Sequence, residues 1–270
     1  PNHYLIMATR NGLVKKTPLS QYGRPLKTGL IAIKLREGDE LVDVAVTKTG
    51  DEILLATSGG MAIRFDQADA RAMGRNTSGV KGISLRKGQS VVGMVVADPE
   101  ATLLTACLNG YGKRTPFGPN DPLTGTRAEG PDVADDADAA EPPTPPPDEP
   151  ADAPEDDESS SQRYRTQRRG GKGIRDIKAT DRNGPVVGIV GVREGDGLLM
   201  ITAGGKIQRI AAGDVSLIGR NTQGVRIMSL DEGDTLAAVV RVPPDDLPAS
   251  DENLIDAPSP EAPPSEPPQA

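Results

Sequence analysis

Short apolar runs alternate with glycine-containing turns along this chain, and one arrangement of them recurs four times. Each copy opens with an apolar run and a tight turn, where glycine supplies the positive φ that a hairpin needs. A later glycine precedes an alternating strand, such as residues 30–35 or 80–85, and a second turn leads into a fourth apolar strand, such as residues 41–46 or 91–96. We expect each copy to form one antiparallel sheet of four strands. The first turns are Asn11-Gly12, Gly59-Gly60, Asn109-Gly110 and Gly204-Gly205, the later glycines are Gly29, Gly79, Gly173 and Gly224, and the second turns contain Gly38, Gly88, Gly184 and Gly233.

The period of the copies predicts an all-β, propeller-like disc. Gly12 and Gly60 are 48 residues apart, and Gly60 and Gly110 are 50 apart. A single sheet of four strands buries one face and is marginal alone, so sheets at this period must pack on one another. Radial stacking achieves this. A stacked β-solenoid and a run of separate sandwiches are the alternatives, although a sandwich domain needs about 100 residues.

The predicted blade repeats are residues 1–48, 49–98, 99–192 and 193–242, and the third contains an insertion at about 118–162. Within the insertion, residues 129–158 hold 13 acidic side chains and no basic one. The tail, residues 243–270, holds 7 acidic side chains and no Lys or Arg. Such composition does not bury enough apolar surface to offset the entropy of ordering, so we expect both segments to be disordered.

This partition changes what the net charge means. The whole chain carries a formal charge of −8, from 31 basic and 39 acidic residues. Without the two acidic segments, 19 acidic residues face all 31 basic ones, so the rest of the chain is about +12. A basic disc with acidic appendages is typical of a protein that binds a polyanion, and the appendages are expected to compete for the same cations.

Basic residues recur at three fixed positions of the copies: four residues after the first-turn glycine, four before the later glycine, and two after it. Equivalent positions of a radial array lie on one ring, so we expect a rim of Arg and Lys that follows a phosphate backbone. The simpler alternative is that these charges only make the strand ends soluble. The chain has 4 Tyr, 2 Phe and no Trp for stacking on bases, and no recognition-helix pattern, so duplex backbone is the expected ligand. The three sets are Lys16, Arg64, Arg114 and Arg209; Arg75, Arg169 and Arg220, with Pro25 as the exception; and Lys81, Arg175 and Arg226, with Ile31 as the exception.

A basic glycine-rich heptapeptide, Gln167-Arg168-Arg169-Gly170-Gly171-Lys172-Gly173, lies in the third copy. Its glycines are expected to bring main-chain N–H groups close to a phosphate, while Arg168, Arg169 and Lys172 provide charge and further donors. Disordered RNA-binding segments and plain turns contain similar runs. No Ser or Thr follows the lysine, so the run is not a Walker loop and a nucleotide site is not predicted.

The heptapeptide matches in full the pattern Gln-basic-Arg-Gly-Gly-basic-Gly, the signature box of the C-terminal domain of DNA gyrase A. Further segments resemble that domain, and the resemblance covers nearly all of residues 4–242 outside the acidic insertion. These segments are residues 11–17 (NGLVKKT), 71–80 (RAMGRNTSGV), 109–115 (NGYGKRT) and 219–225 (GRNTQGV).

The resemblance implies a β-pinwheel, usually of six four-stranded blades, whose basic rim wraps double-stranded DNA with fixed chirality and makes supercoiling directional. It further implies a fragment that lacks the first two blades and the DNA-cleaving region with its catalytic tyrosine. The fragment itself would need no cofactor, whereas the parent ATP-hydrolysing type IIA topoisomerase would use ATP and Mg²⁺ on other domains. Its partners would be the remainder of gyrase A and gyrase B, in a heterotetramer in the bacterial cytoplasm. The family's principal box belongs to the first blade, so the box here resembles a secondary one.

Other chemistry is not expected. His3 and Cys107 are the only histidine and cysteine, so one chain does not build a zinc site, a Ser-His-Asp triad or a disulfide, and Cys107 is expected to be a buried thiol. No catalytic or metal-binding residue is predicted, and no apolar run approaches the roughly 18 residues of a membrane span. Two rival interpretations are the C-terminal domain of the gyrase A counterpart in topoisomerase IV, against which the intact box argues, and a propeller scaffold that binds an acidic protein.

Overall fold

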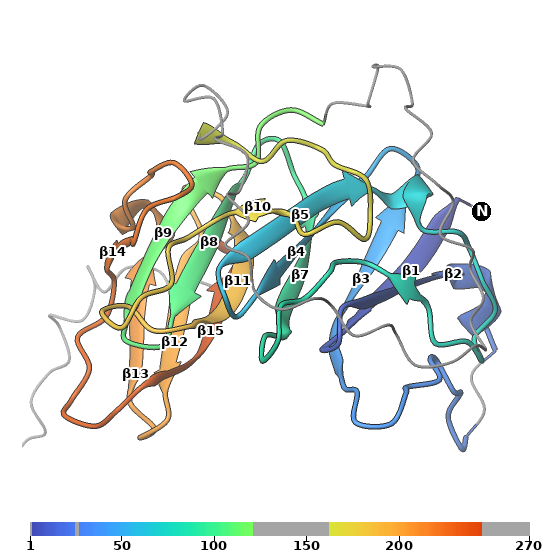
Figure 1. The fold of residues 1–270 in the computed structure, drawn as a ribbon, viewed down its shortest axis with the longest axis horizontal. Coiled ribbons are helices and arrows are strands. Elements are labelled where there is room, and N and C mark those ends of the chain that lie inside the picture. Colours follow the sequence, from blue (N-terminus) through green and yellow to red (C-terminus); the bar gives the residue numbers. More distant parts are fainter. Residues whose placement is uncertain (1, 25–26, 121–161, 245–270) are drawn as a thin grey trace, which may run out of the picture.

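The computed structural model describes residues 2–24, 27–120 and 162–244, and these form four antiparallel sheets placed side by side in an arc (Figure 1). The first copy lies at one end of the arc and the fourth copy at the other. The predicted disorder of the acidic insertion and of the tail falls almost entirely on residues outside the described ranges. The described part is all-β apart from short 3₁₀ turns, as the glycine-punctuated apolar runs predict. These turns include η1 (Leu19–Tyr22), η2 (Gln67–Asp69) and η4 (Ala212–Asp214).

Each sheet runs from an inner strand to an outer edge. The strands β3, β7, β11 and β15, called the inner strands below, contact one another in that order, so the sheets share an inner edge. From the inner strand outward, sheet 1 is β3 (Leu41–Lys48), β1 (His3–Thr9), β2 (Leu13–Pro18) and β6 (Val80–Lys81); sheet 2 is β7 (Val91–Ala97), β4 (Glu52–Thr57), β5 (Met61–Asp66) and β10 (Ile174–Arg175); sheet 3 is β11 (Val186–Val192), β8 (Thr102–Cys107), β9 (Tyr111–Pro116) and β14 (Val225–Arg226); and sheet 4 is β15 (Leu236–Val242), β12 (Gly197–Thr202) and β13 (Ile207–Ala211).

The outer strands β6, β10 and β14 come from the copy that follows, which corrects the expectation that each copy folds into its own four-stranded sheet. β6, from the second copy, pairs with β2 of the first, and the same exchange joins the second copy to the third and the third to the fourth. Glycine permits this close approach: at Gly79, where φ is +99°, a Cβ would lie 2.5 Å from the Val14 carbonyl oxygen. The sheets therefore cross the predicted blade boundaries in the sequence.

The predicted strand at residues 30–35 is wrong, for the same reason. An outer strand needs the sheet of the preceding copy as its partner, and among the described residues no sheet precedes sheet 1. Residues 30–36 have no strand conformation. Sheet 4 shows the converse, since no following copy lies within the described residues and it has three strands instead of four.

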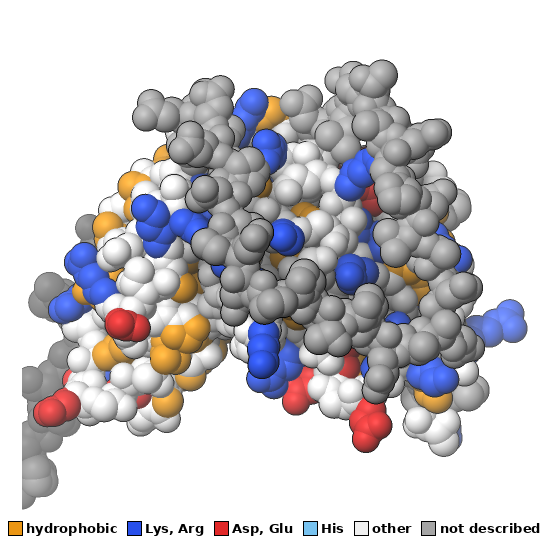
Figure 2. Space-filling model, viewed as in Figure 1, with side chains coloured by type: hydrophobic (Ala, Val, Ile, Leu, Met, Phe, Trp, Pro, Cys, Tyr) orange, Lys and Arg blue, Asp and Glu red, His pale blue; other side chains and the backbone are white. Residues whose placement is uncertain are grey.

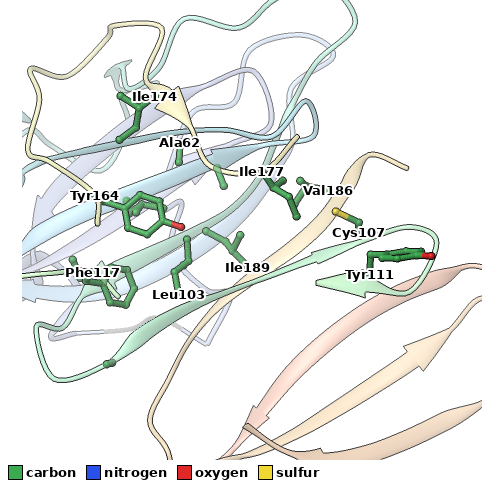
Figure 3. Close-up of a cluster of buried hydrophobic side chains, with 14 residues drawn as sticks. Ala62, Leu103, Cys107, Tyr111, Phe117, Tyr164, Ile174, Ile177, Val186 and Ile189 are labelled. Atoms are coloured by element: carbon green, nitrogen blue, oxygen red, sulfur yellow. The ribbon is translucent and has the colours of Figure 1, made fainter. Parts of the chain in front are cut away.

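The hydrophobic core lies between successive sheets, in three clusters. Ile6 and Phe65 belong to the cluster between sheets 1 and 2, and Leu198 belongs to the one between sheets 3 and 4. The central cluster contains Phe117 and Tyr164, whose ring centroids are 6.2 Å apart (Figure 3). Each fully buried aliphatic or aromatic side chain contributes about 1.5–3 kcal/mol, so packing between sheets, rather than any one sheet, stabilises the array.

Cys107 lies in the central cluster and is fully buried, as expected. Burial, with a further contribution from the nearby Asp176 carboxylate, raises the pKa of its thiol to about 12. The thiol therefore stays protonated at neutral pH and serves as a small apolar group in the core.

Candidate nucleic-acid interface

The outer strands place a basic residue at the same register in three successive sheets. Lys81 lies opposite Leu13, Arg175 opposite Met61, and Arg226 opposite Tyr111. In every case the partner directly follows the first-turn glycine of the preceding copy. Successive residues of a strand point to opposite faces, so the residue before each basic one turns inward. Val80 and Ile174, for example, are 6% and 5% exposed.

This register puts one of the three predicted cationic sets on the outer edge of the array. Lys81 and Arg226 are exposed and Arg175 is half-buried. Lys and Arg side chains extend across the visible face of the molecule from end to end in Figure 2, whereas most of the Asp and Glu side chains in that view lie along its lower margin. The outer edges of sheets 1, 2 and 3 therefore each carry one basic residue at the same register.

The glycine-rich box lies next to this edge and packs against the second copy. The Gln167 N–H donates to the Arg64 carbonyl (2.7 Å), and the Gly170 N–H donates to the Gly82 carbonyl (2.7 Å). Ser84 binds the box in return, through its N–H to the Gly171 carbonyl (2.8 Å) and its hydroxyl to the Gly170 carbonyl (2.8 Å). The Gly170 N–H thus already has a partner, which corrects the expectation that this group is offered to a phosphate.

The glycines of the box have conformational and packing roles. Gly170 has a φ of +86° and Gly173 a φ of +75°, in the region that side chains other than glycine rarely adopt. A Cβ at Gly173 would also lie 2.4 Å from the Ala62 carbonyl oxygen. The exchange of β10 into sheet 2 therefore explains Gly173, and the positive φ explains Gly170.

The basic side chains of the box divide into two kinds. Arg168 and Lys172 are exposed, and within the described ranges neither has a hydrogen bond or ion pair. Arg169 is half-buried and donates to two carbonyls of the preceding copy, from Nε to Asp69 (3.1 Å) and from Nη1 to Lys81 (2.5 Å). Arg168 and Lys172 are therefore open to a ligand, whereas Arg169 fixes the box in place.

Three cations of a second predicted set are buried, which corrects their placement on an exposed rim. Lys16 is 5% exposed, Arg64 1% and Arg114 5%. Each reaches from the hairpin of its own copy to the segment that follows the hairpin of the next copy. Lys16 donates from Nζ to the Gln67 carbonyl (2.9 Å) and side-chain oxygen (2.8 Å), and Arg114 donates from Nε to the Val215 carbonyl (2.8 Å).

Arg64 shows the cause of this burial most clearly. Its Nη1 donates to the carbonyls of Phe117 (2.6 Å) and Tyr164 (2.9 Å), and its Nε forms an ion pair with Glu52 (2.5 Å) that is almost fully buried. A cation that recurs at this position therefore binds backbone oxygens between copies. For Lys16, the same burial lowers the pKa of the ammonium, although Asp66 and Asp69 oppose that shift.

Arg209, the fourth member of this set, is exposed. No copy beyond the fourth lies within the described ranges, so the segment that covers its counterparts is missing there. The predicted cations four residues before the later glycine are also mostly enclosed. Arg75 is half-buried and Arg220 is 3% exposed. The Arg220 guanidinium donates to the carbonyls of Arg163 (2.7 Å) and Arg175 (3.1 Å). For Arg220, too, a rim position is wrong.

A buried polar network ties the segment that carries the box to sheet 3. Asp176, just after β10, accepts a hydrogen bond from the Tyr164 hydroxyl (2.6 Å) and another from Thr105 (2.8 Å), and forms an ion pair with Lys113 (3.0 Å). Burial is the main reason why the pKa of Lys113 is lowered, against the opposing effect of Asp176, and it raises the pKa of Tyr164 well above its usual value. Because β10 pairs with β5 in sheet 2 and Asp176 binds side chains of sheet 3, the segment that carries the box is held against both sheets.

One cationic site was not predicted from the sequence. Arg182 and Arg226 flank the ring of Tyr111, with their guanidinium carbons 5.1 Å and 5.6 Å from its centroid, and both donate to its hydroxyl. These two hydrogen bonds are the main reason why the pKa of Tyr111 is lowered. Arg182 is exposed. It stands two residues before Gly184, as Arg36 and Arg86 stand before the second-turn glycines of the first two copies, so this recurrence is the sequence signal that could have found it.

Neither a metal centre nor a membrane helix is found in the part of the chain that the structure describes. Within it, no three His, Cys, Asp or Glu side chains are grouped so that they could hold a metal ion. No described helix is both long enough and apolar enough to cross a bilayer.

The chain is similar to known proteins along most of its length. Residues 3–48, 51–98, 160–193 and 198–243 match the family model for the DNA gyrase C-terminal domain, beta-propeller. The DNA gyrase A protein of Klebsiella oxytoca is 37% identical over 250 residues, which are 93% of this chain and 23% of the relative. That of Mycolicibacterium smegmatis is 36% identical over 262 residues, 96% of this chain and 26% of the relative. The chain thus spans about a quarter of the length of the curated relatives it matches.

Solved structures share the fold. A structure of the DNA gyrase A C-terminal domain has a TM-score of 0.66 at 24% identity, covering 89% of this chain and 66% of that one. A crystal structure of the C-terminal domain of DNA topoisomerase IV has a TM-score of 0.70 at 22% identity, covering 91% and 64%. The predicted all-β, propeller-like fold is confirmed, and the sequence relatives carry the gyrase name.

Proposed function

The chain belongs to the DNA gyrase C-terminal domain family, and from that premise we propose that it binds double-stranded DNA along the outer edge of its sheets and holds the DNA in a curved, chirally wrapped path. The observation that carries the proposal is the register of Lys81, Arg175 and Arg226, one on each of three successive outer strands. A series of cations along a curved edge fits the backbone of a duplex, which carries a charge about every 1.7 Å of its axis.

Exposed side chains beside this edge extend the proposed contact. Arg168 and Lys172 add two cations next to Lys81 and Arg175, and Arg182 adds a third beside Arg226. The Tyr111 ring holds Arg182 and Arg226 in place before any ligand binds, which lowers the entropy lost on binding. We assign the DNA contact to these exposed and half-buried residues, and Lys16, Arg64, Arg114, Arg169 and Arg220 to the junctions between copies.

Electrostatics supplies the energy for bending in this proposal. Bending 20 to 30 base pairs smoothly through 40 to 90 degrees costs on the order of 1–6 kcal/mol. Release of counterions from neutralised phosphates offsets that cost, and neutralising about ten phosphates gives a slope near −9 for log affinity against log salt. Outside the two acidic segments the chain has an excess of 12 basic over acidic residues, in line with such a contact.

In the cell, we propose that the chain acts as the DNA-wrapping part of gyrase A, together with gyrase B, in the bacterial cytoplasm. Wrapping by this part would give supercoiling its direction, while ATP and Mg²⁺ would act elsewhere in that assembly. The names of the curated relatives favour this proposal over a role in topoisomerase IV.

The proposal is tested by the salt dependence of binding to fluorescently labelled duplexes. Replacing Arg168 and Lys172 together (Arg168→Gln, Lys172→Gln) is expected to weaken binding and to flatten the slope by about 2, because two phosphate contacts are lost. The matched control removes two exposed charges at inner strands, with Lys48→Gln on β3 and Arg193→Gln just after β11, and is expected to leave the slope unchanged.

The length of the duplex gives a second readout of the same experiment. A curved contact along several sheets gains affinity as the duplex lengthens, whereas a site for an acidic peptide does not. An affinity independent of duplex length, or equal slopes for the box variant and its control, would contradict the proposed interface.

A further inference from the structure

We propose that Arg182 and Arg226 bind one and the same phosphate group of the DNA backbone, and that Tyr111 is the positioning residue that holds them for it. The two arginines are called the arginine pair below. The proposal rests on the function proposed above and deepens it, because it assigns a single phosphate site to one point of the proposed DNA contact. The site belongs to sheet 3, at the end where β8 turns into β9.

One phenolic oxygen brings the arginine pair together. Arg182 donates from Nε (3.3 Å) and Arg226 from Nη2 (3.4 Å) to the Tyr111 hydroxyl. Because both guanidinium groups contact the same oxygen, a single anion beside that oxygen can reach both. A guanidinium has five N–H donors, and in the described part of the chain neither arginine side chain makes any other hydrogen bond or an ion pair. Most of their donors therefore remain for a ligand.

The Tyr111 hydroxyl itself lacks one partner. Its oxygen accepts two hydrogen bonds, while its own proton has no acceptor among the described residues. Tyr111 is only 8% exposed, and in Figure 3 its hydroxyl points away from the other labelled side chains of the central cluster. Polar groups of buried side chains are ordinarily hydrogen-bonded. A phosphate oxygen beside the arginine pair would supply the acceptor.

The charges of the arginine pair favour an anion as well. Two guanidinium groups that contact one oxygen repel each other, and no carboxylate of the described residues forms an ion pair with either. The face of the Tyr111 ring, which is negative, offsets part of that repulsion, since the guanidinium carbons lie 5.1 and 5.6 Å from its centroid. A phosphate between the two groups would offset the rest.

A buried amide fixes the backbone that carries the arginine pair. Asn183 is fully buried, and its Nδ2 donates to the carbonyls of Lys178 (2.9 Å) and Gln223 (3.0 Å). It thereby joins the turn of one arginine to the segment of the other. Asn109 holds the same turn from the hairpin, through its Nδ2 and the Arg182 carbonyl (3.2 Å). Groups that are fixed before a ligand binds lose little further entropy on binding.

Among the described sheets, only sheet 3 has this arrangement. The position of Tyr111 is occupied by Leu13 in sheet 1 and by Met61 in sheet 2, although a basic residue lies opposite in each. Arginine stands at the position of Arg182 in the first two copies too. Leu and Met have no hydroxyl that could hold two guanidinium groups, so we assign the shared phosphate to sheet 3 alone.

The salt dependence of duplex binding counts the phosphates. Arg182→Gln and Arg226→Gln together remove two charges but only one phosphate contact, so they are expected to flatten the slope of log affinity against log salt by about 1. The matched comparison is Arg168→Gln with Lys172→Gln, which also removes two charges and is expected to flatten the slope by about 2. A flattening by about 2 for the arginine pair, or none, would overturn the shared phosphate.

NMR of the full chain with ¹³Cζ-labelled tyrosine observes Tyr111 directly, and Tyr111→Phe identifies its resonance. The hydrogen bonds from the arginine pair lower the pKa of Tyr111. A phosphate that neutralises the pair is therefore expected to raise this pKa and to shift the resonance when duplex is added. An unchanged Tyr111 at saturating duplex would overturn the proposal. A response to inorganic phosphate at matched ionic strength, with none to duplex, would overturn the assignment to DNA.

Removal of the hydroxyl tests the positioning role. Tyr111→Phe keeps the ring and is expected to weaken duplex binding roughly 2- to 10-fold, because the pair loses its common partner. Tyr22→Phe is the matched control, since the Tyr22 hydroxyl donates to the Ala32 carbonyl (3.2 Å), and its affinity is expected to equal that of the wild type. Equal affinities of the two variants would contradict the role of Tyr111. Circular dichroism establishes that each variant is folded.

The outcomes separate this site from the function on which it rests. A flattened slope for Arg168→Gln with Lys172→Gln, together with an unresponsive Tyr111, would remove the site and leave the proposed interface in place. A Tyr111 resonance that responds to duplex, with an affinity independent of duplex length, would keep the site and contradict the curved contact.

Discussion

Basic residues at equivalent positions of the repeat have different roles, depending on whether a following copy covers them. Arg64 and Arg209 occupy the same position of the repeat, yet Arg64 is 1% exposed and binds carbonyls of the next copy, whereas Arg209 is exposed. Recurrence in the sequence shows that two residues are structurally equivalent. It does not show that they are accessible, because most partners of the buried cations are backbone carbonyls, which leave no signature in the sequence. This is why the rim predicted at Lys16, Arg64 and Arg114 was wrong.

The different roles of Arg64 and Arg209 predict different effects of the same substitution. Arg64→Gln is expected to lower the free energy of unfolding by about 3–5 kcal/mol, because it leaves the Glu52 carboxylate buried without its partner. Arg209→Gln is expected to change that free energy by no more than about 0.5 kcal/mol, as for other surface substitutions. Chemical denaturation measures both values.

DNA binding by the folded Arg64→Gln protein gives the second readout. Its salt slope should equal that of the wild type, because Arg64 does not face the ligand. A flattened slope, or equal losses of stability for the two variants, would show that Arg64 is not a structural cation.

At the scale of the element, the exchanged outer strand is the unit that joins one copy to the next. The sequence predicted the four copies and their hairpins, because glycine turns and alternating runs are local signals. It did not reveal which sheet receives the strands at Val80, Ile174 and Val225, since alternation indicates a strand and says nothing of a distant partner. The box was found from its composition, but its last glycine, Gly173, is explained by a close contact with Ala62 of the preceding copy.

Two glycines with the same backbone conformation test this explanation. Gly173→Ala and Gly88→Ala both place a side chain at positive φ, which costs roughly 1–2 kcal/mol. Only at Gly173 would the new Cβ lie 2.4 Å from a carbonyl oxygen, so the loss of unfolding free energy is expected to be clearly larger there. Equal losses in denaturant titrations would mean that close packing does not explain this glycine.

At the scale of the whole molecule, the positive charge of the outer edge follows the curved arc of the sheets. The exchange of strands puts Lys81, Arg175 and Arg226 on one outer edge, and the shared inner strands give the array its arc (Figures 1 and 2). The net charge of −8 hides this surface, and only the separation of the acidic segments from the rest of the sequence revealed it. Arginine recurs at the position of Arg182 in the first three copies, but the contact of Arg182 with Tyr111 could not be predicted, because it depends on a turn of the third copy that meets the hairpin of the same copy.

Trapping of DNA supercoils tests the central claim, a chirally wrapped DNA path, most directly. Relaxed circular plasmid is incubated with the chain, closed by ligase, stripped of protein and resolved by gel electrophoresis. The account predicts a shift in linking number that grows with the amount of protein and shrinks with Arg168→Gln and Lys172→Gln. DNA binding with no shift in linking number would contradict it.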